Sequence, residues 1–331
     1  MKRFFLYFIG VFLIVLISIF MLFDKKKTDV KKIRVGEVTH SVFYTPFYVS
    51  IEKGYFNEYG IDIDLSLISG ANNVISSVLS GEVDVGFCGP EATIYVYNEG
   101  EKDYIKSFAG LTKRDGQFIL SRKKNDNFKY TDLIGKEVLA GRTAGMPELN
   151  FENALLHENI DKEKVNINTS VDFASLSSAF ISGTGDYVNL FEPNATKMEQ
   201  QGFGYVVASV GEKSGEMPYT TFNARKSFIK ENKDLLKNFT KALNKGISFT
   251  EKNDSKTIAK IILKQFPDTS LNDLEKIIDR YKNADTWLDN PYIEKKLFNN
   301  LQDLLIDSNL IKEYTDYNKL INNLYKKNET N

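Results

Sequence analysis

The sequence LSGEVDVGFCGPEAT (residues 79–93) has a second copy, ISGTGDYVNLFEPNAT (residues 181–196), further along the chain. In both copies a glycine can take the left-handed conformation that ends a helix, and an aspartate then precedes a short apolar strand. A proline ends that strand before the next helix begins. The pattern indicates one structural unit that is used twice.

Each copy is preceded by a strand, a loop, a helix and a second strand. Alternating strands and helices build a parallel sheet covered by helices, so we expect an α/β protein with two sheets and two lobes. Ligands bind outside the carboxyl ends of parallel strands, which predicts a site in the cleft between the lobes. The expected strands are residues 33–38, 61–68, 137–141 and 165–169, and the expected helices are residues 46–53 and 148–158.

Composition limits the class of protein. A chain of 331 residues fits two compact domains plus an N-terminal segment. Hydrophobic residues at 42% and charged residues at 26% are ordinary globular values. The net charge is −1, with Lys and Arg interspersed among Asp and Glu. That balance gives no attraction to nucleic acid, which we exclude as a partner.

Residues 4–23 form an uncharged apolar run long enough to cross a bilayer as a helix. The run is either a secretory signal or a retained membrane anchor. Retention is favoured by the length of the apolar run and by the absence of a small-x-small cleavage site near residues 18–24. The only cysteine, Cys88, lies far from this segment, which excludes a lipid attached there through cysteine. We expect a transmembrane helix that holds a folded domain at the cell membrane, on its extracellular or periplasmic side.

The chain divides into four parts. Residues 1–24 are the anchor or signal segment, and residues 25–32 are a charged linker. The first lobe comprises residues 33–115 and 219–331, including the C-terminal helices, and the second lobe comprises residues 116–218. The chain crosses twice between the lobes, so we expect a two-stranded hinge that lets them close around a ligand.

Six passages of the chain carry a family likeness: HSVFYTPFYV (40–49), EKGYF (52–56), YGI (59–61), SGEVDVG (80–86), GPEATIY (89–95) and GRTAGMPE (141–148). They resemble the solute-binding proteins of bacterial ABC importers, in the group that binds nitrate, taurine, alkanesulfonates and thiamin pyrimidine precursors. The resemblance covers nearly everything after the linker. It implies a type II periplasmic-binding-protein fold, and as partners an ABC permease with its cytoplasmic ATPase.

Other functions have less support. The eukaryotic pyrimidine synthases related to these binders carry a cysteine-rich motif that this chain lacks. A sensor would need a second signalling domain. His40 and His157 are the only histidines, and their separation gives no metal-site spacing. We therefore expect a monomeric binding protein with no catalytic residue, metal or cofactor.

The candidate ligand contacts come from loops that follow strands. Glu91 and Glu192 stand beside the strand-ending prolines, where a carboxylate accepts hydrogen bonds from amino groups or is simply stabilised at a helix start. Arg142 could hold an anion or pair with a glutamate. Aromatic candidates could stack on a flat ligand or belong to the core. The full set is His40, Phe43, Tyr44, Asn72, Pro90, Glu91, Arg142, Met146, Phe173, Glu192 and Tyr219.

Charge guides the choice of ligand. One uncompensated like-charge contact at about 4 Å and an effective dielectric of about 20 costs about 4 kcal/mol, or roughly a thousandfold in affinity. Two cleft carboxylates therefore favour a neutral or cationic amino-heteroaromatic, such as a thiamin-type aminopyrimidine. The alternatives are taurine, an alkanesulfonate or nitrate, if Arg142 outweighs the glutamates, or an enzyme of pyrimidine biosynthesis on the same scaffold.

Overall fold

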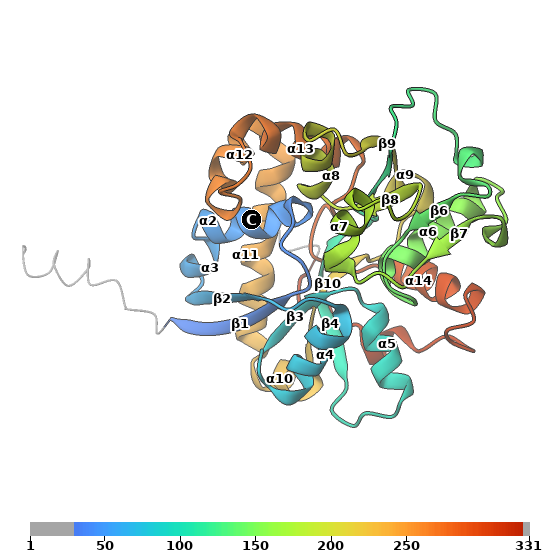
Figure 1. Ribbon diagram of the computed structural model, residues 1–331. Coiled ribbons are helices and arrows are strands. Elements are labelled where there is room, and N and C mark those ends of the chain that lie inside the picture. Colours follow the sequence, from blue (N-terminus) through green and yellow to red (C-terminus); the bar gives the residue numbers. More distant parts are fainter. Residues whose placement is uncertain (1–29, 327–331) are drawn as a thin grey trace, which may run out of the picture.

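Two five-stranded sheets of matching layout form the centre of the protein (Figure 1). The computed structural model describes residues 30–326. The first sheet has the order β2-β1-β3-β10-β4 and the second β7-β6-β8-β5-β9. The strands are β1 Lys31–Glu37, β2 Ile61–Leu67, β3 Val85–Cys88, β4 Ile105–Thr112, β5 Phe118–Ser121, β6 Glu137–Leu139, β7 Asn166–Asn168, β8 Tyr187–Leu190, β9 Tyr205–Ser209 and β10 Thr220–Arg225.

The repeated sequence forms the same unit in both sheets, as predicted. β3 and β8 each occupy the third position of their sheet. Asp84 accepts a hydrogen bond of 3.0 Å from the backbone N–H of Arg34 at β1, and Asp186 accepts one of 3.0 Å from that of Glu137 at β6. The aspartate in each copy therefore fastens the start of the third strand to its parallel neighbour.

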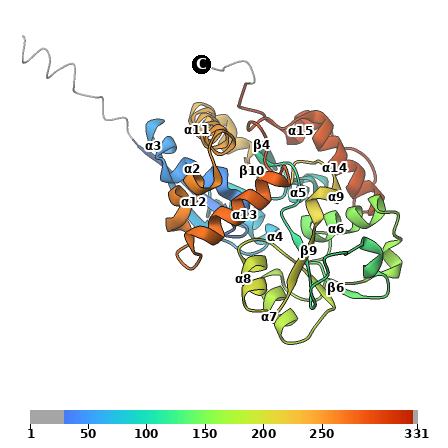
Figure 2. The same ribbon diagram turned by 90° about the horizontal axis from the view of Figure 1, so that it is seen from above.

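Helices cover both faces of the first sheet, and helices of the second lobe surround the second (Figures 1 and 2). Short 3₁₀ turns lie at η1 Val42–Tyr44, η2 Tyr130–Leu133, η3 Lys162–Lys164, η4 Phe173–Ser175 and η5 Leu263–Gln265. The α-helices are α2 Thr45–Glu52, α3 Tyr55–Glu58, α4 Ala71–Ser80, α5 Glu91–Asn98, α6 Met146–His157, α7 Leu176–Ile181, α8 Asn194–Gln200, α9 Val210–Ser214, α10 Lys226–Glu231, α11 Lys233–Lys252, α12 Ser255–Ile262, α13 Leu271–Asn283, α14 Lys295–Asp307 and α15 Tyr317–Leu320.

Aromatic packing joins the first sheet to its helices. The rings of Phe87 on β3 and Phe222 on β10 stack with their centroids 4.2 Å apart and their planes 2° from parallel. Phe239 of α11 meets the Phe222 ring edge-on at 5.0 Å. All three side chains are fully buried. This packing holds β3, whose carboxyl end opens on the cleft, against the long helix α11.

Both sheets are mixed: the alternating strands and helices predicted parallel strands, and the strands that follow each crossing run the other way. β1, β2 and β3 are parallel, but β10 runs antiparallel to both β3 and β4. In the second sheet β5 runs antiparallel to β8 and β9. Each of these strands enters its sheet directly from the other lobe, so no crossover helix turns it into the parallel direction.

The two crossing segments lie side by side. The backbone N–H of Met217 donates to the carbonyl of Lys113 at 2.9 Å, and that of Tyr219 donates to the carbonyl of Thr112 at 3.0 Å. We propose on this basis that the lobes meet at a two-stranded hinge, with residues 33–115 and 219–331 in the first lobe and residues 116–218 in the second. Within residues 30–326, no helix has the length and apolar character needed to cross a membrane. The apolar run at residues 4–23 lies outside the described residues.

We predict that Gly246→Ala destabilises the first lobe. A Cβ at Gly246 of α11 would lie 2.2 Å from the Pro46 carbonyl oxygen of α2 and 2.0 Å from the Ser50 hydroxyl oxygen. Overpacking of this kind costs about 1–3 kcal/mol, which exceeds the helix-propensity gain of about 1 kcal/mol. Urea denaturation measures the change. Lys241→Ala, at an exposed position of the same helix, is the control; equal unfolding free energies for the two variants would contradict the prediction.

Candidate functional site

A cavity of about 70 Å³ lies between the lobes, at the ends of strands from both sheets. Loops after β1, β2 and β3 line it from the first lobe, and loops after β6, β7 and β8 line it from the second. The start of β10 contributes from the hinge. The lining residues are Val38, Thr39, Tyr44, Gly70, Ala71, Gly89, Glu91, Arg142, Met146, Pro147, Phe173, Phe191, Tyr219 and Thr220.

The inner end of the cavity is enclosed. Tyr44, Glu91, Met146 and Tyr219 are all buried, and Glu91 is only 1% exposed. Arg142 is partly exposed, with a side chain 31% accessible to solvent.

Glu91 and Arg142 face each other across the cleft without completing a hydrogen bond. Arg142 Nη2 lies 3.5 Å from Glu91 Oε1. Among the described residues, neither Glu91 Oε2 nor Arg142 Nη2 has a hydrogen-bond partner, although both atoms are buried. Burial raises the pKa of Glu91 to about 7, against the opposing charge of Arg142. The pair therefore offers a ligand one free acceptor and one free donor.

The two lobes approach each other closely at Gly89 and Met146. A Cβ at Gly89 would lie 2.6 Å from Cγ of Met146 and 2.1 Å from Glu91 Oε2. Glycine therefore lets the start of α6 reach the end of β3. The loop before α6 is held by Glu148, whose carboxylate accepts a hydrogen bond of 2.6 Å from the Ala144 N–H. This loop carries Arg142 into the cavity.

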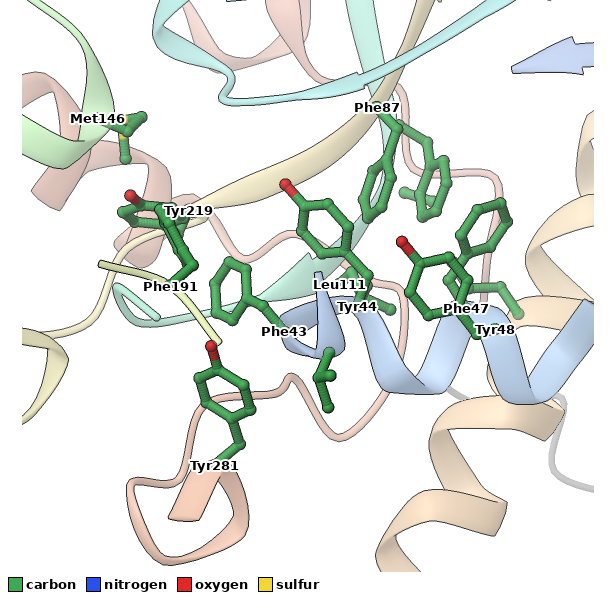
Figure 3. Packing of buried hydrophobic residues seen from close by; sticks show 14 of the residues in the cluster. Phe43, Tyr44, Phe47, Tyr48, Phe87, Leu111, Met146, Phe191, Tyr219 and Tyr281 are labelled. Carbon is green, nitrogen blue, oxygen red and sulfur yellow. The ribbon is translucent and has the colours of Figure 1, made fainter. Parts of the chain in front are cut away.

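Aromatic side chains form much of the wall. Tyr219 and Phe191 lie near Met146 on one side of Phe43, and Tyr44 lies on the other side (Figure 3). Phe43 itself does not line the cavity. Its fully buried ring packs 5.2 Å from Phe191 and 5.6 Å from Tyr219, so it supports the lining rings from behind.

His40 has a structural role in this protein. Its Nδ1 lies 2.6 Å from Glu37 Oε1, and its Nε2 lies 2.8 Å from the carbonyl oxygen of Gln265. Burial opposes a positive charge on this ring, but the Glu37 carboxylate and the Gln265 carbonyl raise its pKa. Because both nitrogens are engaged, His40 ties the end of β1 to η5 and does not line the cavity.

Glu192 also lies away from the cavity lining. Its carboxylate pairs with Arg280 of α13 and accepts hydrogen bonds from the backbone and hydroxyl of Thr196. One glutamate, Glu91, therefore faces the cavity where the repeat predicted two. Asn72 is exposed on α4, and Pro90 is buried at the start of α5; neither lines the cavity.

Six of the residues selected from the sequence line the cavity: Tyr44, Glu91, Arg142, Met146, Phe173 and Tyr219. Sequence reasoning missed Phe191, which directly follows β8. It also missed Arg280, since α13 shows only a stripe of core residues.

Among residues 30–326, no group of His, Cys, Asp and Glu is arranged to hold a metal ion.

Comparisons with known proteins agree with this architecture. The family described as "NMT1/THI5 like" matches residues 42–256. A Bacillus subtilis (strain 168) protein named "Putative binding protein YtlA" is 39% identical over 310 residues, covering 92% of this chain and 93% of the relative.

Solved structures share the fold. A ligand-binding component of an ABC-type import system from Staphylococcus aureus matches with a TM-score of 0.68 and 16% identity, over 90% of this chain and 98% of that one. The alkanesulfonate-binding protein SsuA of Xanthomonas axonopodis pv. citri matches with a TM-score of 0.68 and 14% identity, over 88% and 98%. The nitrate-binding protein NrtA of Synechocystis PCC 6803 gives 0.60 and 16%, over 77% and 70%. At these identities the likeness concerns the fold alone.

We predict that Glu91 makes stability fall as pH rises. Its pKa is raised from 4.5 to about 7 in the folded protein, so the folded state binds the proton more tightly than the unfolded state. The free energy of unfolding should therefore fall between pH 4.5 and 7, by on the order of 3 kcal/mol from this group. The free energy of unfolding of Glu91→Gln should not show this decrease.

Urea denaturation of both proteins at several pH values measures this effect. The stability of Glu91→Gln relative to the parent should rise between pH 4.5 and 7 and then level off. Glu152→Gln, which alters an α6 carboxylate paired with Lys162 outside the cavity lining, is the control. Parallel pH profiles for Glu91→Gln and the parent would show that Glu91 titrates normally.

Proposed function

We propose that this chain, which belongs to the NMT1/THI5-like family, is the solute-binding component of an ABC-type importer. It captures a small polar solute between its lobes and delivers it to a permease that works with a cytoplasmic ATPase. Family membership, the relationship to a binding protein over 92% of the chain and the shared fold support this role. We further propose that the folded domain acts as a monomer on the extracellular or periplasmic side of the membrane, joined to it through residues 4–23.

The proposed solute is a thiamin-type aminopyrimidine. The observation that carries this proposal is the pair of unpartnered atoms, Glu91 Oε2 and Arg142 Nη2, at one cavity. An aminopyrimidine presents an amino donor and ring-nitrogen acceptors on a flat ring, so it can satisfy a carboxylate and a guanidinium together. The rings of Tyr44, Phe173 and Phe191 supply apolar walls for its faces.

Capture is favoured over catalysis because, among the described residues, the cavity wall offers one side chain that titrates near neutral pH, Glu91, and no second acid or base to act with it. The one described histidine near the site, His40, has both nitrogens engaged by Glu37 and Gln265. The remaining ionisable groups of the cavity wall are Glu91, Arg142, Tyr44 and Tyr219. Burial raises the pKa of both tyrosines well above 10, so neither serves as a base near neutral pH.

A second candidate is a sulfonate or nitrate, with taurine the strongest case. Arg142 Nη2 is a free donor, and only one carboxylate faces the cavity, so repulsion of an anion is weaker than two glutamates would produce. Taurine could place its ammonium group at Glu91 and its sulfonate at Arg142. Binding measurements with both classes of solute separate the candidates.

We predict that an aminopyrimidine binds and that Glu91→Gln weakens it by about tenfold or more, through loss of a charge-assisted hydrogen bond. Thermal-shift screening followed by calorimetric titration tests this, with taurine, an alkanesulfonate and nitrate as competing solutes. Glu152→Gln should bind like the parent. Tight binding of taurine or nitrate without any response to aminopyrimidines would reverse the choice of ligand and make Arg142 the principal contact.

We also predict that protease added to protoplasts or spheroplasts, in which only the cytoplasmic membrane encloses the cell, degrades the folded domain, because the domain would lie outside that membrane. Immunoblotting before and after detergent lysis measures this. A cytoplasmic protein serves as the control for cell integrity. Full protection of the chain until lysis would remove the importer role.

A further inference from the structure

A second interlobe contact surrounds Glu192 and differs in kind from the Glu91–Arg142 pair. The carboxylate of Glu192, in the second lobe, forms an ion pair with Arg280 of α13. Arg280 Nη2 also lies 3.1 Å from Glu199 Oε2 on α8, so the guanidinium forks between two glutamates of the second lobe. α13 packs on α12 and η1, which belong with the first sheet. The fork therefore joins the lobes.

The backbone of Glu192 is held from the first lobe as well. The Ser41 hydroxyl donates to the Glu192 carbonyl at 2.6 Å, and the Glu192 N–H donates to the Tyr281 hydroxyl at 3.1 Å. That hydroxyl in turn donates to the Gly116 carbonyl at 3.0 Å. Ser41, Tyr281 and Glu192 are each at most 1% exposed. We call Ser41, Arg280, Tyr281 and Glu192 the latch.

The latch lies outside the cavity lining, and the carboxylate oxygens of Glu192 already have partners within the protein. None of its four residues lines the cavity. In the view of Figure 3, Tyr281 lies below Phe43, whereas Met146 and Tyr219 lie above it. Both carboxylate oxygens of Glu192 are occupied, one by Arg280 and both by Thr196. A solute in the cavity would therefore have nothing to add to these contacts.

We propose that the latch sets how much of the protein is closed, independently of which solute is bound, and that Arg280 is its positioning residue. The inference rests on the proposed solute-binding function. Opening the lobes would break the ion pairs of Arg280 with Glu192 and Glu199 and the hydrogen bonds of Ser41 and Tyr281 to the Glu192 backbone, so these contacts favour the closed form. Closed protein is the binding-competent form, so the apparent dissociation constant of any solute scales inversely with the closed fraction. The latch contributes equally to the affinity for every solute, and the Glu91–Arg142 pair sets the preference among solutes.

Distance measurements between two spin labels test the latch without any ligand. Ser76→Cys on α4 and Ala174→Cys on η4 provide exposed label sites on the two sides of the cleft, while Cys88 is fully buried. The full chain is measured in detergent by pulsed electron resonance. Arg280→Gln should shift the distance distribution to longer values. A distribution that superimposes on the parent's would overturn the proposal.

Two further variants make the result specific. Lys282→Gln lies on the same helix, but its ammonium group donates to the Asn253 carbonyl at the end of α11, so it should leave the distances unchanged. Arg280→Lys keeps the charge but lacks the two separate guanidinium nitrogens that reach Glu192 and Glu199, so its shift should be intermediate. If Arg280→Gln does not fold, as judged by circular dichroism, Arg280→Lys decides: parental distances would refute the latch.

Solute titrations separate failure of the latch from failure of the proposed function. Arg280→Gln should weaken every bound solute by the same factor, about tenfold, whereas Glu91→Gln should change the preference among solutes. Weakening confined to one solute would contradict the latch. If none of the tested solutes binds the parent, the proposed ligand fails, but the distance distributions still confirm or refute closure by Arg280.

Discussion

A buried carboxylate needs a positive partner, and in this protein the partner comes from the opposite lobe in both copies of the repeat. Glu91 follows β3 in the first lobe and faces Arg142 of the second. Glu192 follows β8 in the second lobe and pairs with Arg280 on α13 of the first. Each glutamate is 1% exposed, so separating the lobes would break a pairing of opposite charges that the closed form shields from water. Closure and the chemistry of the cleft therefore depend on the same electrostatic requirement.

The two ion pairs differ in whether all their carboxylate and guanidinium atoms have hydrogen-bond partners, and this difference gives them different roles. Glu192 has its oxygens occupied by Arg280 and Thr196, whereas Glu91 keeps one oxygen and Arg142 one nitrogen without a hydrogen bond. The Glu192–Arg280 pair, whose carboxylate oxygens are occupied, favours the closed form to the same extent with every solute. The Glu91–Arg142 pair gains hydrogen bonds from a solute that carries both a donor and an acceptor. Binding free energy can then be directed to recognition of the solute, because the latch contributes to closure.

Local sequence signals predicted the secondary structure well because they act over short distances. Gly81 and Gly183 have φ of +80° and +106°, as a left-handed helix end requires, and Asp84 and Asp186 start equivalent strands. Long-range pairings were beyond those signals. Arg280 lies in a helix whose pattern reveals only its buried stripe, so nothing near Glu192 identified its partner. The antiparallel direction of β10 likewise depends on where the returning chain enters the sheet.

The structure of a complex with a thiamin-type aminopyrimidine tests the central claim most directly. We expect crystals grown with this solute to contain the ring among Tyr44, Phe173 and Phe191, with its amino group within hydrogen-bond distance of Glu91 and an acceptor facing Arg142. The Glu192–Arg280 pair should be unchanged beside it. A solute bound elsewhere on the protein, or one that leaves Glu91 and Arg142 facing each other without contacting either, would contradict the account.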